Sequence, residues 1–235
     1  MKKTKVLLIL VCAVLLVAAS VMGTLAYLTS TDEVQNTFTV GQVHIELDEA
    51  KVGDNGKALI GNSAARVKEN SYNLMPGHTY DKDPTVTVRN GSEESYIKMV
   101  VTVNKADELD KIFKDHSLDF GLETVVTGYD DTKWELQGEG GEKDDAGNRT
   151  YTFYYYQTVS AKDGDVKLEP LFKNIKIPGN LTNDEMKTLQ YKHTVEAGKI
   201  VWGDEEKLSI SVKAYAIQAD GFDDADTAWD YFPTT

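Results

Sequence analysis

Residues 85–103 read TVTVRNGSEESYIKMVVTV, and this stretch decides the fold class of the chain. Its first five residues alternate valine with a polar side chain, which is the period of a strand buried on one face. Asn90 and Gly91 come next, a pair that favours a tight turn. The run from 96 to 103 is rich in β-branched residues, which favour strands. The stretch therefore predicts two strands joined by a turn.

Strand patterns recur on both sides of this stretch. Four further segments alternate or are rich in strand-forming residues: 43–47, 148–159, 166–177 and 207–217. Apolar residues fall at helical spacing in only three short segments: 106–115, 181–190 and 225–232. Many short strands with regular turns predict an antiparallel β-sandwich or barrel that carries a few short helices.

The N-terminus has the three-part layout of a secretory signal peptide. Three lysines within the first five residues precede an apolar run over residues 6–22, and a small-residue stretch then ends at Ala26. We expect cleavage between Ala26 and Tyr27, which divides the chain into a signal peptide, 1–26, and one β-sandwich domain, 27–235. The alternative is a retained signal anchor, although a membrane span needs about 20 apolar residues. Membrane contact is expected only through the uncleaved signal.

The remaining domain is acidic and has no cysteine. Cleavage removes three of the 25 basic residues of the chain and leaves 22 against 38 acidic ones, a net charge of −16. The single cysteine, Cys12, lies in the apolar run, so the domain has no disulfide or thiolate metal site. This charge disfavours nucleic acid and anionic membranes as partners. It also predicts a protein that associates more readily when salt screens the charge.

No catalytic or metal-binding pattern stands out in the sequence. The four histidines lie far apart and give no helical zinc pair: His44, His78, His116 and His193. No serine lies in a nucleophile elbow, and no glycine-rich loop precedes a helix. Four aspartates lack the spacing of a calcium loop and are interpreted as solvated acids near a helix start: Asp220, Asp223, Asp224 and Asp226. We therefore expect no enzyme, and no catalytic residue, cofactor or metal.

Two stretches resemble the TasA/camelysin family, whose members are Gram-positive proteins exported through a dedicated signal peptidase of the SipW type. The first stretch comprises GTLAYLT at 23–29, NTFTVG at 36–41 and VHIEL at 43–47. The second comprises NLMPG at 73–77 and the strand and turn at 85–92. The resemblance spans residues 20 to 103, and the middle of the chain is without a match.

This resemblance implies a jelly-roll-like antiparallel β-sandwich that is secreted and works in an extracellular fibre or biofilm matrix. It also implies the SipW-type peptidase as a partner during export. Some family members are described as metalloendopeptidases, but this sequence has no matching zinc motif. A secreted hydrolase is therefore the least favoured of three hypotheses. The first is a fibre subunit, and the second is a cell-surface module for ligand binding or adhesion.

The segment freed by cleavage, residues 27–41, is the candidate functional element. It is rich in threonine and apolar at four positions: Leu28, Val34, Phe38 and Val40. Such an extended segment can add as a strand to the open sheet edge of a neighbouring subunit, which predicts self-association into fibres. It can equally form the first strand of its own domain, and both readings stay open for residues 27–34. For residues 38–47 the alternation favours the core of their own domain over strand exchange.

Overall fold

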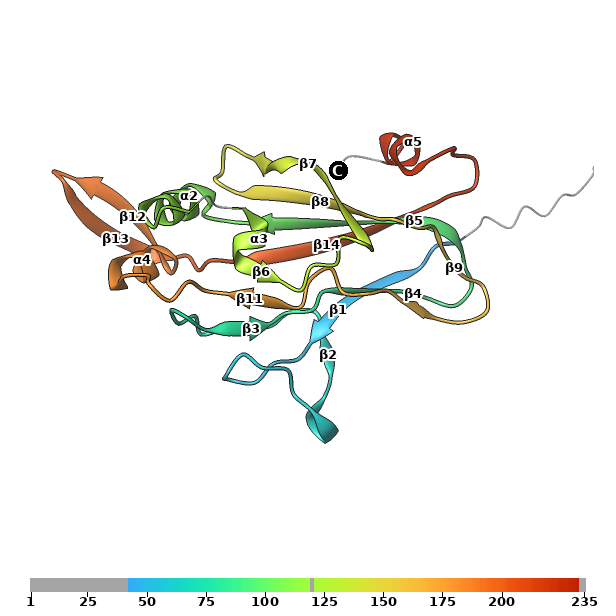
Figure 1. The fold of residues 1–235 in the computed structure, drawn as a ribbon, viewed down its shortest axis with the longest axis horizontal. Coiled ribbons are helices and arrows are strands. Elements are labelled where there is room, and N and C mark those ends of the chain that lie inside the picture. Colours follow the sequence, from blue (N-terminus) through green and yellow to red (C-terminus); the bar gives the residue numbers. More distant parts are fainter. Residues whose placement is uncertain (1–41, 119–120, 233–235) are drawn as a thin grey trace, which may run out of the picture. The chain divides into compact units, whose positions relative to one another are not determined.

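The computed structural model describes residues 42–118 and 121–232. Its larger sheet is built around strand β5 (Ser92–Val103) (Figure 1). Every second side chain of β5 from Ile97 to Val103 is at most 1% exposed, so one face of this strand lies in the core. The other strands of this sheet are β14 (Ile210–Gln218), β8 (Arg149–Tyr155), β7 (Trp134–Lys143) and β9 (Val159–Ala161). The order is β14-β5-β8-β7, and β9 pairs with the start of β5.

Two short sheets form the opposite layer. One has the order β10 (Val166–Lys167), β4 (Thr85–Val88), β1 (Ile45–Ala50) and β2 (Arg66–Val67). The other has the order β3 (Thr79–Asp81), β11 (Asn174–Lys176) and β6 (Val126–Thr127). Val86 and Val88 of β4 are fully buried in the same apolar core as the inward face of β5. The described pairings are antiparallel, so the predicted mainly β antiparallel sandwich with short helices is confirmed.

The turn at Asn90 and Gly91 is present, and it leads from one layer to the other. Gly91 has a φ of +86°, a left-handed conformation that glycine adopts without steric cost. Ser92 N–H donates to the carbonyl of Arg89 at 3.1 Å and closes the turn. The two strands that flank this turn find their partners elsewhere, since β4 pairs with β1 and β10, and β5 pairs with β8 and β14.

Short helices cover one end and part of the outer face of the sandwich. The described α-helices are α2 (Ala106–Asp115), α3 (Leu122–Val125), α4 (Asn183–Thr188) and α5 (Ala225–Asp230). The first three lie at the same end of the sheets (Figure 1). Helix α4 begins with a capping box, in which Thr182 and Glu185 bond to each other's backbone N–H. Helix α5 packs on the outer face of the larger sheet, where Trp229 contacts Lys98 and Tyr154.

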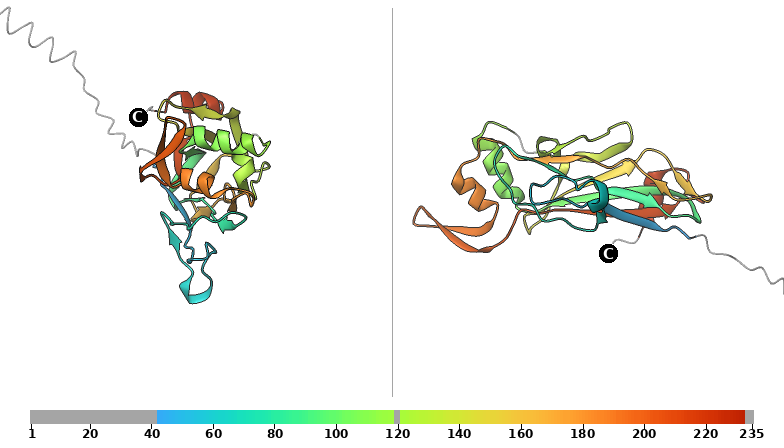
Figure 2. Two further views of the ribbon diagram at one scale, coloured as in Figure 1. Left: turned by 90° about the vertical axis from the view of Figure 1, so that its left-hand side faces the viewer. Right: turned by 90° about the horizontal axis from the view of Figure 1, so that it is seen from below.

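Two segments project from the sandwich (Figure 2), and the sequence patterns predicted neither. One is the hairpin of β12 (Tyr191–Glu196) and β13 (Lys199–Glu205), which leaves Val195 67% exposed and Ile200 44% exposed. The other is formed by residues 51–78, which include β2 and a single 3₁₀ turn (Gly61–Ser63) before the chain returns to the layer at β3. Both projections border the site described next.

Candidate functional site

Strand β14 is an edge of the larger sheet, and no strand among the described residues pairs with its outer side. At the two ends of the β14–β5 ladder, Asn104 N–H donates to Ser209 O, and Ala219 N–H donates to Glu94 O. Because antiparallel ladders alternate, the odd-numbered residues of β14 bond to β5. The even-numbered residues direct their N–H and C=O groups away from β5. We call these outward groups, at Ile210, Val212, Ala214 and Ala216, the β14 edge.

The side chains of the same four residues point into the sandwich but are only partly buried. They pack against the main core cluster and still remain partly accessible, whereas Met99 and Val101 on the neighbouring strand are fully buried. No described strand therefore forms hydrogen bonds along this edge, although β1 lies close to it. A long edge strand with accessible apolar side chains and unpaired backbone groups is a template for an added strand.

The edge of the opposite layer is covered. Strand β1 comes close to β14 without pairing with it. His44 O accepts from Arg89 N–H, so the even-numbered residues there bond toward β4 and Leu47 directs its carbonyl outward. Lys68 Nζ donates to this Leu47 carbonyl at 2.8 Å. Strand β2 and the Lys68 side chain thus cover the outer side of β1, whereas no described strand pairs with the β14 edge.

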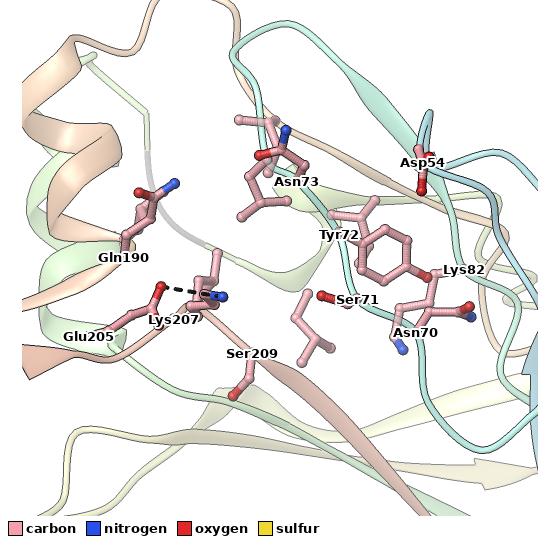
Figure 3. A pocket seen from close by; sticks show the side chains of 16 residues that line it. Asp54, Asn70, Ser71, Tyr72, Asn73, Lys82, Gln190, Glu205, Lys207 and Ser209 are labelled. Atoms are coloured by element: carbon pink, nitrogen blue, oxygen red, sulfur yellow. Dashed lines mark ion pairs between the residues drawn. The ribbon is translucent and has the colours of Figure 1, made fainter.

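A cleft of ≈ 830 Å³ opens at the start of β14 (Figure 3). Its apolar lining includes Ile175 and Ile177 near β11, together with Leu208 and Ile210. Polar side chains form two facing walls: Asn70, Ser71 and Tyr72 lie on one side, and Gln190 and Glu205 lie on the other (Figure 3). The volume falls in the range of small-molecule sites, about 300–1,000 Å³. The cleft and the β14 edge share Ile210, so they form one continuous surface.

Tyr72 holds one wall of the cleft in place. Its hydroxyl donates to the carbonyl of Asp81 at 2.9 Å, and its ring meets Tyr80 edge to face with 5.7 Å between centroids. Burial raises the pKa of the Tyr72 hydroxyl, and the negative charge of Glu49 adds to this effect. The hydroxyl therefore stays protonated and acts as a hydrogen-bond donor over the neutral pH range.

Glu49, Asn70 and Lys82 form a polar cluster at this wall, in which Glu49 and Lys82 are buried and Asn70 is partly buried. Lys82 Nζ lies 2.6 Å from Glu49 Oε2, and Asn70 Nδ2 donates to Glu49 Oε1 at 2.9 Å. The Lys82 and Glu49 side chains are 11% and 5% exposed. Asn70 Nδ2 also donates to Ala50 O at 2.8 Å, while its Oδ1 accepts from Val52 N–H at 3.0 Å. Every polar atom of the Asn70 amide is therefore fixed.

Sequence reasoning missed this cluster, although one signal for it was present. Val43, Ile45 and Leu47 predict which face of β1 is buried, and Glu49 continues the same odd-numbered series. A carboxylate on a buried strand face needs a partner, because burying an unpaired charge is costly. Nothing in the sequence points to Lys82, 33 residues further along the chain, as that partner.

The strand-exchange residues predicted from the sequence lie outside the described residues, as does the predicted cleavage site: Leu28, Val34, Phe38, Val40, Ala26 and Tyr27. Asp224 caps α5 by accepting from Thr227 N–H at 2.8 Å, and this backbone hydrogen bond lowers the pKa of Asp224. His116 bonds to Glu185 and Asn180. Within residues 42–118 and 121–232, no three His, Cys, Asp or Glu side chains come together as metal ligands.

No protein-family model, curated protein or solved structure matches this chain. Among the described helices, none has the length and apolar character that crossing a bilayer requires. The features of the described residues that point to a function are the β14 edge and the cleft.

Proposed function

We propose that this protein is a secreted structural subunit that assembles into extracellular fibres by β-strand addition. The observation that carries the proposal is the β14 edge, where four residues offer partly buried apolar side chains and backbone groups that no described strand pairs with. An added strand gains main-chain hydrogen bonds along this edge and places alternate side chains against the core. An isolated edge of this kind favours association with another chain.

The proposed occupant is the segment 27–41 of a second copy. Its four apolar residues all have even numbers, so they share one face when the segment is extended: Leu28, Val34, Phe38 and Val40. That face would cover the apolar row of β14, although it also carries Ser30, Asp32 and Asn36 between the apolar positions. The odd-numbered residues would face solvent. The segment carries a free N-terminus only after export and cleavage behind Ala26, for which a SipW-type signal peptidase is the expected partner. Assembly is then confined to the outside of the cell.

The test compares protein 27–235 with protein 42–235 by electron microscopy and light scattering. Fibres are expected from the first and monomers from the second. A synthetic peptide of residues 27–41 should bind the shorter protein, and the same peptide with serine at its four apolar positions should not. Fibres of unchanged amount and shape from protein 42–235 would refute the strand-donor proposal.

The cleft supports a second candidate, a cell-surface module that binds a small polar ligand. Its apolar floor and facing polar walls resemble ligand sites in general, and Tyr72 is its one aromatic side chain. Under this hypothesis the mature protein stays monomeric in solution, and a column that carries the immobilised protein retains soluble cell-wall fragments. Replacing Ser209 with tryptophan would fill the cleft and abolish this retention. A wild-type protein that forms fibres and retains no fragment would exclude the binding-module hypothesis.

A further inference from the structure

Glu49, Asn70 and Lys82 bring together the parts needed to form a covalent bond between two side chains. Lys82 offers an amine, and Asn70 offers an amide carbon. Both nitrogens hydrogen bond to one carboxylate, Lys82 Nζ to Oε2 and Asn70 Nδ2 to Oε1 of Glu49. Figure 3 shows the Asn70 and Lys82 side chains next to each other below Tyr72. Attack of the amine on the amide requires this kind of enforced proximity.

The remaining requirements are a proton carrier and a donor for the oxyanion. Glu49 is placed to take a proton from Lys82 and to pass it to the departing Asn70 nitrogen, as a general base and then a general acid. Val52 N–H already bonds to Asn70 Oδ1 at 3.0 Å, the atom on which negative charge develops. The low exposure of Lys82 and Glu49 keeps water from competing with the amine.

We propose that Lys82 and Asn70 form an intramolecular isopeptide bond, with Glu49 as the proton carrier. Lys82 Nζ gives a proton to Glu49, and its lone pair attacks Asn70 Cγ to form the new C–N bond. The C=O electron pair moves onto Oδ1, where Val52 N–H stabilises it. The tetrahedral intermediate then collapses, and the Cγ–Nδ2 bond breaks. The two protons lost by the lysine ammonium end on Nδ2, which leaves as ammonium, and no oxidant or other reactant is needed.

The reaction depends on folding, because the three residues come from separate segments. Glu49 lies on β1, Asn70 follows β2, and Lys82 follows β3. The product ties the end of the 51–78 projection to the chain just after β3. A plain buried ion pair would need only Lys82 and Glu49, whereas here the amide is also oriented at both its nitrogen and its oxygen. The proposal is independent of fibre formation and of ligand binding in the cleft.

The decisive measurement is the mass of the purified mature protein and of its tryptic peptides after denaturation. The intact protein should be lighter than its sequence by one ammonia molecule. Trypsin cleaves after lysine and arginine, so an unmodified chain gives peptides 69–82 and 83–89. The isopeptide bond blocks cleavage after Lys82 and gives a single peptide, 69–89, that carries the whole mass loss. Full intact mass and efficient cleavage after Lys82 would overturn the proposal.

The peptide result also separates the bond from ring closure at an asparagine, which loses ammonia too. Such a ring leaves trypsin free to cleave after Lys82, and finding the mass loss with that cleavage would count against the isopeptide bond. Three variants should restore the full mass: Lys82→Arg, Asn70→Ala and Glu49→Gln. The matched control is Lys57→Arg, because Lys57 is an exposed lysine paired with Asp81, and this variant should retain the loss. Because the wild-type masses decide the matter alone, a variant that fails to fold leaves the test intact.

Discussion

The ammonium group of Lys98 lies over the ring of Trp229, with 4.2 Å between Nζ and the ring centroid. Tyr215 and Phe232 also lie near this ammonium, at 5.5 and 5.3 Å. The contact holds α5 on the outer face of the larger sheet. There, aromatic ring faces take the place of part of the water around the charge of Lys98. Burial lowers the pKa of Lys98, so the aromatic contacts do not fully compensate for lost hydration.

We expect Trp229→Ala to lower the free energy of unfolding by about 3 kcal/mol, because the side chain is large and 93% of its residue surface is covered by α5 and the sheet. Lys98→Met keeps the apolar stem and should change the stability at pH 7 by less than about 1 kcal/mol. The pKa of Lys98 is lower in the folded state than in the unfolded state. At pH values just below the usual lysine pKa, about 10.4, the unfolded chain therefore binds more protons than the folded protein. Urea unfolding should therefore show that the free energy of unfolding of the wild-type protein, relative to that of Lys98→Met, is higher at pH 10 than at pH 7.

Gly56 and Gly91 give a matched pair of glycine substitutions. Both have a positive φ, +69° and +86°, so an alanine at either position costs about 1–2 kcal/mol of backbone strain. A Cβ at Gly56 would also lie 2.2 Å from the ring of Tyr80, whereas one at Gly91 would meet nothing within 4 Å. Gly56→Ala should therefore destabilise the protein by clearly more than Gly91→Ala. Equal shifts in urea midpoint would show that the Tyr80 ring moves aside freely.

The capping box of α4 gives a test at acidic pH. Thr182→Ala should cost about 1 kcal/mol, the usual loss for an N-cap. Burial raises the pKa of Glu185, but hydrogen bonds from the N–H and hydroxyl of Thr182 and from His116 lower it more, so the pKa lies below its usual value. The contribution of Glu185 is thus present above its usual pKa near 4.3 and is lost as the pH falls through its lower folded value. Glu185→Gln should reduce the loss of stability between pH 5 and pH 3, as measured by thermal unfolding.

Proline substitutions distinguish the two sides of β14. Ala214→Pro removes an N–H that points away from β5, so the protein should fold and lose the ability to polymerise. Lys213→Pro removes an N–H that bonds to β5 and should destabilise the fold by about 3 kcal/mol or more. Circular dichroism and electron microscopy on both variants separate the effects. Normal fibres from a folded Ala214→Pro protein would place assembly elsewhere on the molecule.

Salt should accelerate fibre formation. Residues 27–235 carry a net charge of −16, and copies of this segment of the chain repel one another over a distance near the Debye length, about 10 Å at 0.1 M salt. Raising the salt from 0.01 to 0.3 M should shorten the lag phase seen by light scattering. A lag phase that lengthens with salt would mean that opposite charges, rather than strand addition, dominate the contact between subunits.

Local periodicity predicted the elements whose own residues determine them. Helix α2 matches the spacing of Leu109, Ile112 and Phe113, and β5 matches its run of β-branched residues. Strand β7 was missed because glycines at 138, 140 and 141 lower its strand propensity. It forms because β8 supplies a ready partner, and the register shifts between Gln137 and Glu142 to accommodate the glycines. Tertiary pairing here overrides local preference.

The candidate site was less predictable for a different reason. Alternation over residues 207–217 predicted a strand, but it carries no information about whether the strand lies at the edge or the centre of a sheet. That position depends on which strands pair, and pairing is non-local. The cluster at Glu49 likewise depends on Asn70 and Lys82 arriving from distant segments. Of this cluster, the sequence allowed only one prediction, which face of β1 is buried.

The contrast between the β14 edge and the β1 edge has a consequence for growth. Strand β2 and the hydrogen bond from Lys68 to Leu47 O cover the outer side of β1, while no described strand pairs with the β14 edge. A subunit that accepts a strand on one side and donates one from its N-terminus makes a head-to-tail contact, which does not close on itself unless the rotation between copies allows a ring. A filament built this way is polar: one tip shows a vacant β14 and the other an unused N-terminal segment, and the two tips elongate at different rates.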